Sequence, residues 1–160
     1  MELIRFRKAN ESDLILYFNW ANDPLVRVQS YNSDKVSIIE HTNWFLEKLN
    51  DNSCYLYIFQ NELNEYIGQV RIQKTEDCDS IIGISIDSNF RGKGLGTQML
   101  QLSAEEFFRS NPNAVIQAYV KFENTSSKRI FEKAGYQMVD EILYNNIKSF
   151  HFIKYANREF

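Results

Sequence analysis

The sequence predicts a single α+β domain, in which a mixed, mostly antiparallel sheet of about seven strands is flanked by helices. The first reason is that strand-like and helix-like segments alternate along all 160 residues, with no break in composition, low-complexity tract or internal repeat. The second is length, because a chain of this size can form one domain with a real core. The third is a glycine-rich turn that joins a strand to a helix.

Strands are expected where apolar, β-branched and aromatic residues alternate with polar ones. In the strand before the glycine-rich turn, Ile82, Ile84 and Ile86 share one face. The last two strands turn at Asn145-Asn146, because asparagine tolerates the positive φ of a tight hairpin. The predicted strands are residues 2–7, 54–60, 65–74, 80–87, 114–121, 136–144 and 147–155.

Helices are expected where apolar residues recur three and four positions apart. Asn10 and Asp13 suit a helix start, because asparagine can cap the first N–H groups and an acid suits the first turn. Gly135 suits a helix end, where a left-handed residue is common. The predicted helices run from Asn10 to just before Asp23-Pro24, over 24–30, over 37–50, over 95–109 and from Asn124-Thr125 to Gly135. With the long helices counted, the order is β-α-α-β-β-β-α-β-α-β-β.

Composition excludes several classes of protein and site. A net charge of −3 argues against nucleic acid as a partner, because domains that bind a duplex carry a basic surplus. No apolar run is long enough to span a membrane, and the N-terminus lacks the basic and apolar regions of a secretory signal. Cys54 and Cys78 are too few and too far apart for a disulfide framework or a zinc site. We therefore expect no metal and a reduced, cytoplasmic compartment.

The glycine-rich turn carries the main functional signal. Three of the six glycines, Gly92, Gly94 and Gly96, lie within five residues. Glycine lets a ligand approach the backbone, and the free N–H groups and dipole of a helix start attract anions. Arg91 and Lys93 add full positive charges. The turn therefore predicts a pyrophosphate cradle, with an ordinary turn carrying two solvated cations as the alternative.

The spacing of the turn excludes two other phosphate loops. A Walker loop needs Gly-Lys-Ser/Thr, which does not occur in the chain, and a dinucleotide fingerprint needs a third glycine where Thr97 stands. The run from Arg91 to Gly96 instead fits the pattern Gln/Arg-x-x-Gly-x-Gly/Ala. In this it resembles the acetyl-coenzyme A signature of the GNAT superfamily of N-acetyltransferases.

A second segment and the order of elements support the resemblance. The segment from Glu123 to Tyr136 is similar to the family's Asn-x-x-Ala/Ser-x-x-x-Tyr-Glu-Lys-x-Gly-Phe motif, and the elements follow the order of the GNAT fold. The resemblance covers essentially the whole chain and implies one acyl-coenzyme A N-acyltransferase domain over residues 1–160. It also implies an enzyme that moves acetyl from acetyl-coenzyme A, its co-substrate, directly to a primary amine without a covalent acyl-enzyme.

The resemblance implies how acetyl-coenzyme A is held. The turn would bind its pyrophosphate, and the strand edge before the turn would hydrogen-bond its pantetheine arm. One N–H of that edge would polarise the thioester carbonyl, where attack builds negative charge. Asn124 would also bind the pantetheine; its alternative is a helix cap, for which Thr125 or Ser126 is favoured. The implied cofactor-binding residues are Ile84, Ser85, Ile86, Arg91, Gly92, Lys93, Gly94, Leu95, Gly96, Thr97, Asn124, Ser127 and Phe131.

The position of the family's general acid departs from the pattern. The tyrosine that commonly protonates the departing thiolate falls at Phe131, which has no proton to give. The acid could be Tyr119 or Tyr136, or it could be water. It could also be unnecessary, because a thiol pKa of about 8.5 makes thiolate a tolerable leaving group. The general acid therefore stays unassigned.

His41 and Ser85 are the candidate catalytic residues. An alkylammonium must lose a proton before it attacks, and histidine is the side chain best matched to that task. His41 is expected on the helix over 37–50, with packing or exposure to solvent as its alternative. Ser85 and Asp87 lie on the opposite face from the three isoleucines and could order a proton-carrying water. His151 is an ordinary strand residue or part of the pocket wall.

The front third of the chain resembles a narrower group. Three stretches within residues 16–45 are similar to the ribosomal-protein alanine acetyltransferases. They are closer still to acetyltransferases of amino-sugar pathways such as pseudaminic acid synthesis, which act on a UDP-linked 4-amino sugar. This resemblance implies that Tyr31, Asn32 and His41 contact the acceptor, with loop chemistry and a packed helix as the alternatives.

The expected function is N-acetylation of a small-molecule primary amine, such as a nucleotide-linked amino sugar. A protein N-terminus is the alternative acceptor within the enzyme class. A coenzyme A-binding module that senses or scaffolds without catalysis is the alternative from another class, and Phe131 favours it. Neither nucleic acid nor a membrane is an expected partner, and a homodimer stays open.

Overall fold

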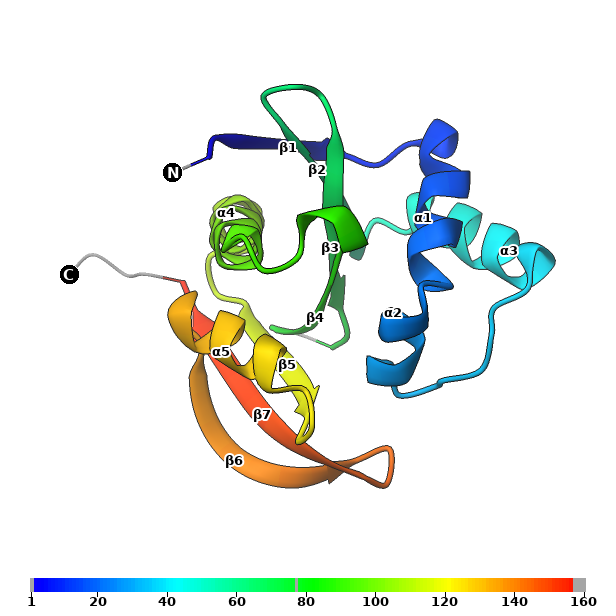
Figure 1. Ribbon diagram of the computed structural model, residues 1–160. Coiled ribbons are helices and arrows are strands. Elements are labelled where there is room, and N and C mark those ends of the chain that lie inside the picture. Colours follow the sequence, from blue (N-terminus) through cyan, green and yellow to red (C-terminus); the bar gives the residue numbers. More distant parts are fainter. Residues whose placement is uncertain (1, 77, 157–160) are drawn as a thin grey trace.

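A seven-stranded sheet runs through the molecule, with helices on both faces (Figure 1). The computed structural model describes residues 2–76 and 78–156, so Met1, Asp77 and residues 157–160 of the predicted domain lie outside the described residues. The strands are β1 (Ile4–Lys8), β2 (Cys54–Asn61), β3 (Tyr66–Lys74), β4 (Asp79–Ile86), β5 (Val115–Lys121), β6 (Gln137–Tyr144) and β7 (Ile147–Tyr155). They lie in the order β1-β2-β3-β4-β5-β7-β6, and among these described strands β4 and β5 form the one parallel pair.

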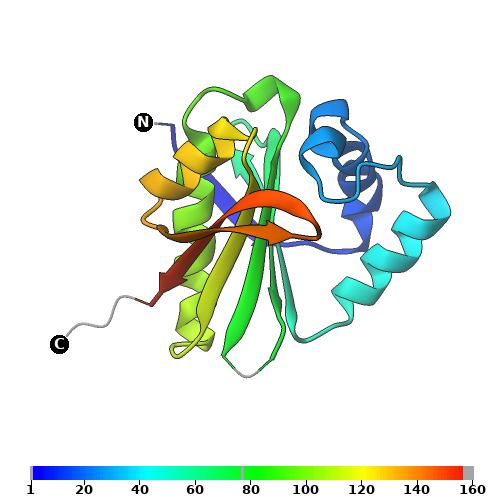
Figure 2. The same cartoon turned by 90° about the horizontal axis from the view of Figure 1, so that it is seen from below.

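Two layers of helices cover the sheet, as the view from below in Figure 2 shows. They are α1 (Leu14–Ala21), α2 (Pro24–Gln29), α3 (Ile38–Leu49), α4 (Leu95–Ser110) and α5 (Thr125–Lys133), with the short 3-10 turns η1 (Glu11–Asp13) and η2 (Ser88–Phe90). Helices α4 and α5 lie on one face and α1 to α3 on the other. The predicted fold class and order of elements are confirmed. Over the two described ranges, no helix is long and apolar enough to cross a membrane.

The ends of the elements follow the predicted cap and turn chemistry. The Asn10 side chain caps the first turn, and Asp13 accepts a hydrogen bond from the Asn10 N–H, which confirms the predicted helix start. That first turn is 3-10 before α1 begins. Gly135 has φ +87 after α5, and Asn145 and Asn146 have φ +48 and +64 at the tip of the β6–β7 hairpin. These left-handed residues lie where the sequence predicts them.

The larger core lies between the sheet and helices α4 and α5. Met99, Leu100 and Phe107 of α4 are completely buried there, and the predicted isoleucine face of β4 packs against the same cluster. Each fully buried side chain of this size contributes about 1.5–3 kcal/mol. This packing fixes α4 on the sheet, and with it the turn that leads into the helix.

A smaller core lies on the opposite face, between the sheet and helices α1 and α3. Tyr17 and Trp20 of α1 and Phe45 of α3 are buried against Leu56 and Ile58 of β2. The sheet separates the two cores. Helices α1 and α3 are therefore anchored on β2. In the described part of the chain, the buried cluster of this core contains no residue of β4, so the end of β4 can make polar contacts on this face.

Strands β4 and β5 part soon after they begin to pair. Their ladder runs only from the pair Asp79 and Val115 to the pair Ile81 and Gln117. Beyond it, β4 stays paired with β3 as far as Ile86, and β5 pairs with β7. Within the described residues, the edge of β4 that faces β5 therefore has no strand partner over 82–86. Such an edge presents N–H and C=O groups that need other partners.

Candidate active site

The glycine-rich turn follows the open edge of β4 and leads into α4. Gly92 and Gly94 have φ +76 and +77, a left-handed conformation that glycine adopts far more readily than other residues. A Cβ built on either would meet no atom within 4 Å among the described residues. The turn therefore needs glycine for its conformation, and the space in front of it is open to a ligand.

The start of α4 has the properties of an anion site. Gly94 is the N-cap residue, and it has no side chain that could accept a hydrogen bond from the first turn. The N–H groups of that turn have no partner inside the helix. These groups and the dipole of the 16-residue helix favour an anion. The geometry supports the predicted pyrophosphate cradle.

A third glycine lets α4 begin close to its neighbours. A Cβ on Gly96 would lie 2.9 Å from Cδ1 of Ile86 and 3.0 Å from Cδ1 of Ile130, which is too close for ordinary packing. Ile86 ends β4, and Ile130 lies in α5. The missing side chain of Gly96 thus brings the strand edge, the start of α4 and α5 together.

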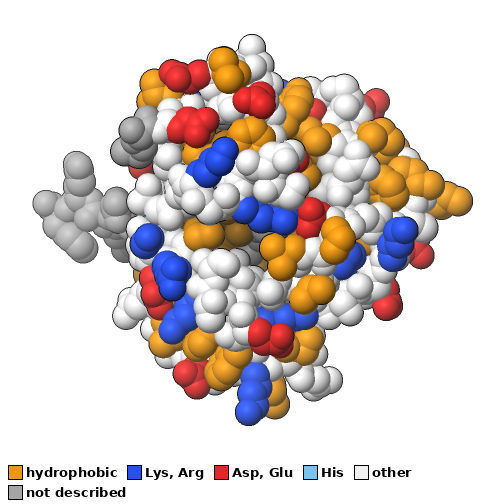
Figure 3. Space-filling model, in the orientation of Figure 1, with side chains coloured by type: hydrophobic (Ala, Val, Ile, Leu, Met, Phe, Trp, Pro, Cys, Tyr) orange, Lys and Arg blue, Asp and Glu red, His pale blue; other side chains and the backbone are white. Residues whose placement is uncertain are grey.

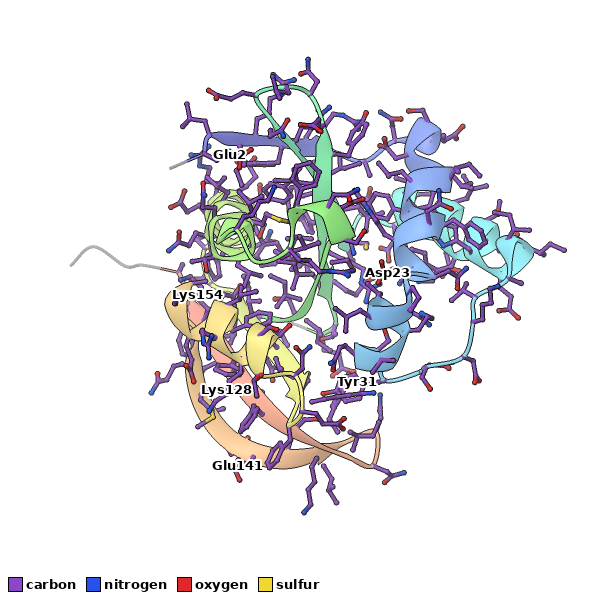
Figure 4. The ribbon with its side chains drawn as sticks, in the orientation of Figure 1. Glu2, Asp23, Tyr31, Lys128, Glu141 and Lys154 are labelled. Carbon is purple, nitrogen blue, oxygen red and sulfur yellow. The ribbon has the colours of Figure 1, made fainter. Side chains whose placement is uncertain are left out.

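The two cations of the turn differ in their surroundings. Nη2 of Arg91 lies 3.0 Å from Oδ1 of Asp23, which also caps α2 by accepting from the Leu25 N–H. Burial tends to raise the pKa of Asp23, but the bonds from Arg91 and from backbone N–H groups lower it below its usual value. Lys93 is exposed, with Nζ 5.2 Å from the ring centre of Phe90. Arg91 therefore ties the turn to α2, at whose start Figure 4 labels Asp23.

Asn124 caps helix α5. Its Oδ1 accepts a hydrogen bond of 3.2 Å from the Ser127 N–H. The prediction that Thr125 or Ser126 is the cap is wrong, because Thr125 is already the first helical residue and Asn124 has the non-helical conformation of a cap. Capping uses only the carbonyl oxygen. The amide N–H2 group of Asn124 can therefore still donate to a ligand.

Polar side chains end β4 on the face that carries α1 to α3. Oγ of Ser85 accepts a hydrogen bond of 3.1 Å from Nε2 of Gln69 on β3, so the Ser85 O–H can donate elsewhere. The Asp87 carboxylate accepts from the Trp20 indole N–H at 2.9 Å and from the Asn89 N–H at 3.0 Å. Asp87 therefore joins α1 to the turn, and each of its two oxygens has a donor.

Four rings gather on the same face. The ring of Tyr119 stacks between those of Tyr144 and His151, at centre distances of 3.9 and 4.8 Å. The hydroxyl groups of Tyr31 and Ser149 are 2.6 Å apart, and the Tyr31 ring meets Tyr144 edge-on at 4.8 Å. These contacts join the loop after α2 to the β6–β7 hairpin, and Figure 4 labels Tyr31 beside the hairpin tip.

The surface is hollowed between these parts. In the orientation of Figure 1, the hollow lies between α4 and α5 on one side and α2 on the other (Figure 3). The glycine-rich turn and the open edge of β4 border this region. The arrangement can hold a long ligand along the strand edge, with an anionic group at the start of α4.

The chain matches one known family over most of its described length. The family described as Acetyltransferase (GNAT) domain matches residues 4–137. The chain belongs to the GNAT acetyltransferase family. The predicted superfamily and the predicted enzyme class are confirmed, while the narrower resemblance of the front third stays a prediction. No curated protein matches the chain.

Solved structures share the fold of this acetyltransferase at low sequence identity. A spermidine N-acetyltransferase from Vibrio cholerae, in complex with CoA and spermine, is 16% identical, with a TM-score of 0.84 and 94% of each chain covered. The aminoglycoside acetyltransferase AAC(6')-Ib, in complex with coenzyme A and kanamycin, is 20% identical, with a TM-score of 0.82 and coverage of 96% of this chain and 95% of its own. A domain from Methanocaldococcus jannaschii is 20% identical, with a TM-score of 0.81 and coverage of 96% and 99%.

Phe131 of the acetyltransferase lies in the larger core. Its side chain is 3% exposed and packs against the rings of Tyr136 and Phe152, at 5.0 and 5.9 Å. Tyr136 is also buried, its hydroxyl has no partner in the described part of the chain, and burial raises its pKa. Burial likewise raises the pKa of Tyr119, whose hydroxyl donates to Oε1 of Gln117. We assign none of these residues as the general acid.

His41 lies inside the smaller core. It is 3% exposed, its Nε2 lies 3.1 Å from the Leu14 carbonyl oxygen, and its ring stacks on Phe45 at 5.8 Å. Burial lowers the pKa of His41, and the bond to Leu14 offsets part of that effect. His41 therefore joins α1 to α3. We assign it no role in proton transfer or in binding the acceptor.

Two side chains near the site, Trp20 and Gln69, were not singled out by the sequence, because no local pattern marks their contacts. Trp20 donates a hydrogen bond to Asp87, and Gln69 donates one to Ser85. Each reaches its partner from a different element.

Of the predicted acceptor residues, Asn32 is exposed, and its Oδ1 accepts from the N–H of Asp34 as in an ordinary loop. Across residues 2–76 and 78–156, no group of three or more His, Cys, Asp or Glu side chains could hold a metal ion.

Proposed function

We propose that this acetyltransferase moves acetyl from acetyl-coenzyme A directly to the primary amine of a small molecule in a ternary complex, and that the acceptor is a nucleotide-linked amino sugar. One observation carries the proposal: the open edge of β4, the glycine-rich turn and the start of α4 are continuous. Together they offer backbone groups along a line that ends at an anion site. Acetyl-coenzyme A has the matching order of groups, a pyrophosphate, an amide-bearing arm and a thioester.

The residues of the open edge fit the donor. The N–H groups from Arg91 to Thr97 would bind the pyrophosphate, and the edge from Ile84 to Ile86 would pair with the pantetheine amides like an added strand. When bound, acetyl-coenzyme A supplies the thioester. An N–H of the β4 edge would polarise the thioester carbonyl as negative charge develops on its oxygen. Asn124 would donate its amide N–H2 group to the same arm.

The acceptor would approach from the sheet face that carries α1 to α3. Ser85 lies there at the open edge, and its O–H can order a water that takes the ammonium proton. The contact between Tyr31 and Ser149 joins the loop after α2 to the β6–β7 hairpin beside this face, and we take this bridge to favour a small molecule over a protein N-terminus. The spermine and kanamycin complexes of the structural neighbours support a small amine. The similarity of the front third supports an amino sugar.

An acceptor screen tests the proposal. The purified protein is incubated with acetyl-coenzyme A and one of four amines: a UDP-linked 4-amino sugar, spermidine, kanamycin or a peptide with an N-terminal alanine. Release of free thiol and the mass of the product are measured, and turnover is expected with the amino sugar. Coenzyme A binding without turnover on any amine would favour the non-catalytic module. A trapped acetyl-cysteine that is competent for turnover would contradict direct transfer.

A further inference from the structure

Arg71 is a partly buried arginine of β3. Among the described residues, its guanidinium makes no ion pair and no hydrogen bond. The other partly buried arginines near the helices do have oxygen partners. Arg7 and Arg91 pair with carboxylates, and Arg27 donates to backbone carbonyls. Arg71 therefore needs a separate explanation.

The guanidinium of Arg71 lies over the open part of β4. Arg71 pairs with Gly83 across the β3–β4 ladder, and its Nη2 lies 3.7 Å from where a Cβ on Gly83 would stand. Gly83 comes two residues after Ile81, where the pairing of β4 with β5 ends. The side chains that surround it or act on its charge are the neutral groups of Trp44, Cys54, Tyr17 and Tyr144.

A cation in neutral and partly dry surroundings is costly unless an anion joins it. Burial lowers the pKa of Arg71, because the charged form loses water. The ring of Trp44, 5.3 Å away, offsets part of this cost, but it accepts none of the five N–H donors as an oxygen would. A guanidinium matches carboxylate and phosphate groups through two parallel hydrogen bonds. The surroundings of Arg71 therefore fit an anion that does not belong to the described residues.

Three carboxylates near this face already have partners. Asp23 pairs with Arg91, and Asp87 accepts from Trp20. Asp140 lies 3.2 Å from Nδ1 of His151. A polycationic acceptor would need carboxylates that are free to meet it, because interacting surfaces carry complementary charge. The face offers an unpaired guanidinium in their place.

We propose that Arg71 binds an oxyanion of the acceptor, a phosphate or carboxylate group, and so selects anionic amines over polyamines. The inference rests on the proposed function, because it takes the acceptor to lie on this face. Ser85 follows Gly83 by two residues along β4, a rise of about 7 Å. An acceptor whose amine lies near Ser85 would therefore carry its oxyanion about 7 Å away, at Arg71.

The test titrates anions into protein that is saturated with coenzyme A, so that the glycine-rich turn is already filled. Inorganic phosphate, uridine diphosphate and succinate are compared by calorimetry on the wild type, Arg71→Met and Arg71→Lys. The wild type should bind at least one anion saturably, and Arg71→Met should bind it about tenfold more weakly or worse. Arg71→Lys should show a smaller loss. Arg5→Met removes an exposed arginine of β1 and should match the wild type.

The three anions distinguish the sources of the oxyanion. Tightest binding of uridine diphosphate indicates a nucleotide, tightest binding of phosphate a phosphorylated amine, and tightest binding of succinate a carboxylate. The inference is overturned if the wild type binds no anion, or if Arg71→Met binds the anion as tightly as the wild type.

The same samples keep the test separate from folding and from the proposed function. Coenzyme A affinity and the thermal midpoint are measured for each variant. If Arg71→Met does not fold, the comparison of Arg71→Lys with the wild type becomes the test. Failure of the wild type to bind coenzyme A would contradict the proposed function itself. Coenzyme A binding without anion binding would contradict only the role of Arg71.

Discussion

The two sides of the open β4 edge are built for their ligands in different ways. Toward α4 and α5, the proposed donor site consists of backbone groups: two left-handed glycines, a helix start and a strand edge. Toward α1 to α3, the proposed acceptor face consists of side chains from separate elements, among them Tyr31, Arg71, Tyr119 and Tyr144. A backbone site demands a fixed glycine spacing, whereas a side-chain site can change one residue at a time. The donor can therefore be inferred from a short motif, and the acceptor cannot.

The largest effect is expected on the backbone side. Gly94→Val forces a β-branched residue to φ +77 and fills space in front of the turn. The backbone strain alone costs about 1–3 kcal/mol. We expect coenzyme A to bind about a hundredfold more weakly, measured by calorimetry. Gln101→Val places the same residue on the exposed side of α4 and should leave the affinity unchanged. Equal affinities in the two variants would mean that the pyrophosphate does not lie on this turn.

The second prediction concerns Phe131, which stands where the family commonly has the tyrosine that acts as general acid. Phe131→Tyr adds a hydroxyl beside Tyr136 and Phe152, in a core where an unpaired hydroxyl costs about 1–3 kcal/mol. We expect the free energy of unfolding in urea to fall by that amount and kcat not to rise. Tyr136→Phe removes a buried hydroxyl that has no partner among the described residues, and it should not destabilise the fold.

The opposite result for Phe131→Tyr would change the view of the donor side. A higher kcat at unchanged stability would show that the new hydroxyl reaches the departing thiolate. A single substitution would then restore the general acid of the family pattern. The absence of that acid would be a property of this chain.

The parts that were predictable from the sequence are those with a local signal. Cap and turn residues such as Asn10, Gly135 and Asn145 mark element ends by their own conformational preferences. The resemblance implied a strand edge over 84–86 that is free to bind the pantetheine arm, but the point where β4 and β5 part was not predicted, because the sequence carries no marker of where a ladder stops. The bond between Trp20 and Asp87 joins residues 67 positions apart, and such contacts leave no local pattern. The cap of α5 was mispredicted, because asparagine, serine and threonine all cap well and neighbouring candidates cannot be ranked by type alone.

On the acceptor side, a smaller effect is expected at the contact between the loop and the hairpin. Tyr31→Phe keeps the ring against Tyr144 and removes the hydroxyl that meets Ser149 at 2.6 Å. A hydrogen bond of this kind is worth about 1 kcal/mol, so KM for the acceptor should rise about fivefold while coenzyme A affinity stays the same. Ser149→Ala should give a similar change. Because the two residues share one bond, the double variant should be no worse than Ser149→Ala, which also removes the bond that Ser149 Oγ donates to the Ile147 carbonyl. Additive changes, or a loss of coenzyme A affinity, would contradict this separation of the two sides.

The last effect concerns His41, and it tests whether the acceptor side contains a titrating base. Burial lowers the pKa of His41 in the folded chain, whereas an unfolded histidine has a pKa of about 6.5. Below that pH, the unfolded chain takes up a proton that the folded chain resists, so stability falls as the pH falls. Between pH 7.5 and 5.5, one such group can lower the free energy of unfolding by no more than about 1.4 kcal/mol.

His41→Phe keeps a ring beside Phe45 and removes the titrating group, so its stability should change less between these two pH values than that of the wild type. His151 is present in both proteins, and the difference between them therefore isolates His41. The pH profile of kcat should be the same in both, because a ring that is 3% exposed and bonded to Leu14 cannot reach an amine. A loss of the acidic limb of that profile in His41→Phe would instead make His41 the base. The acceptor face would then extend into the smaller core and include a buried side chain of α3. The division between the backbone donor site and the side-chain acceptor face would have to be redrawn to include that helix.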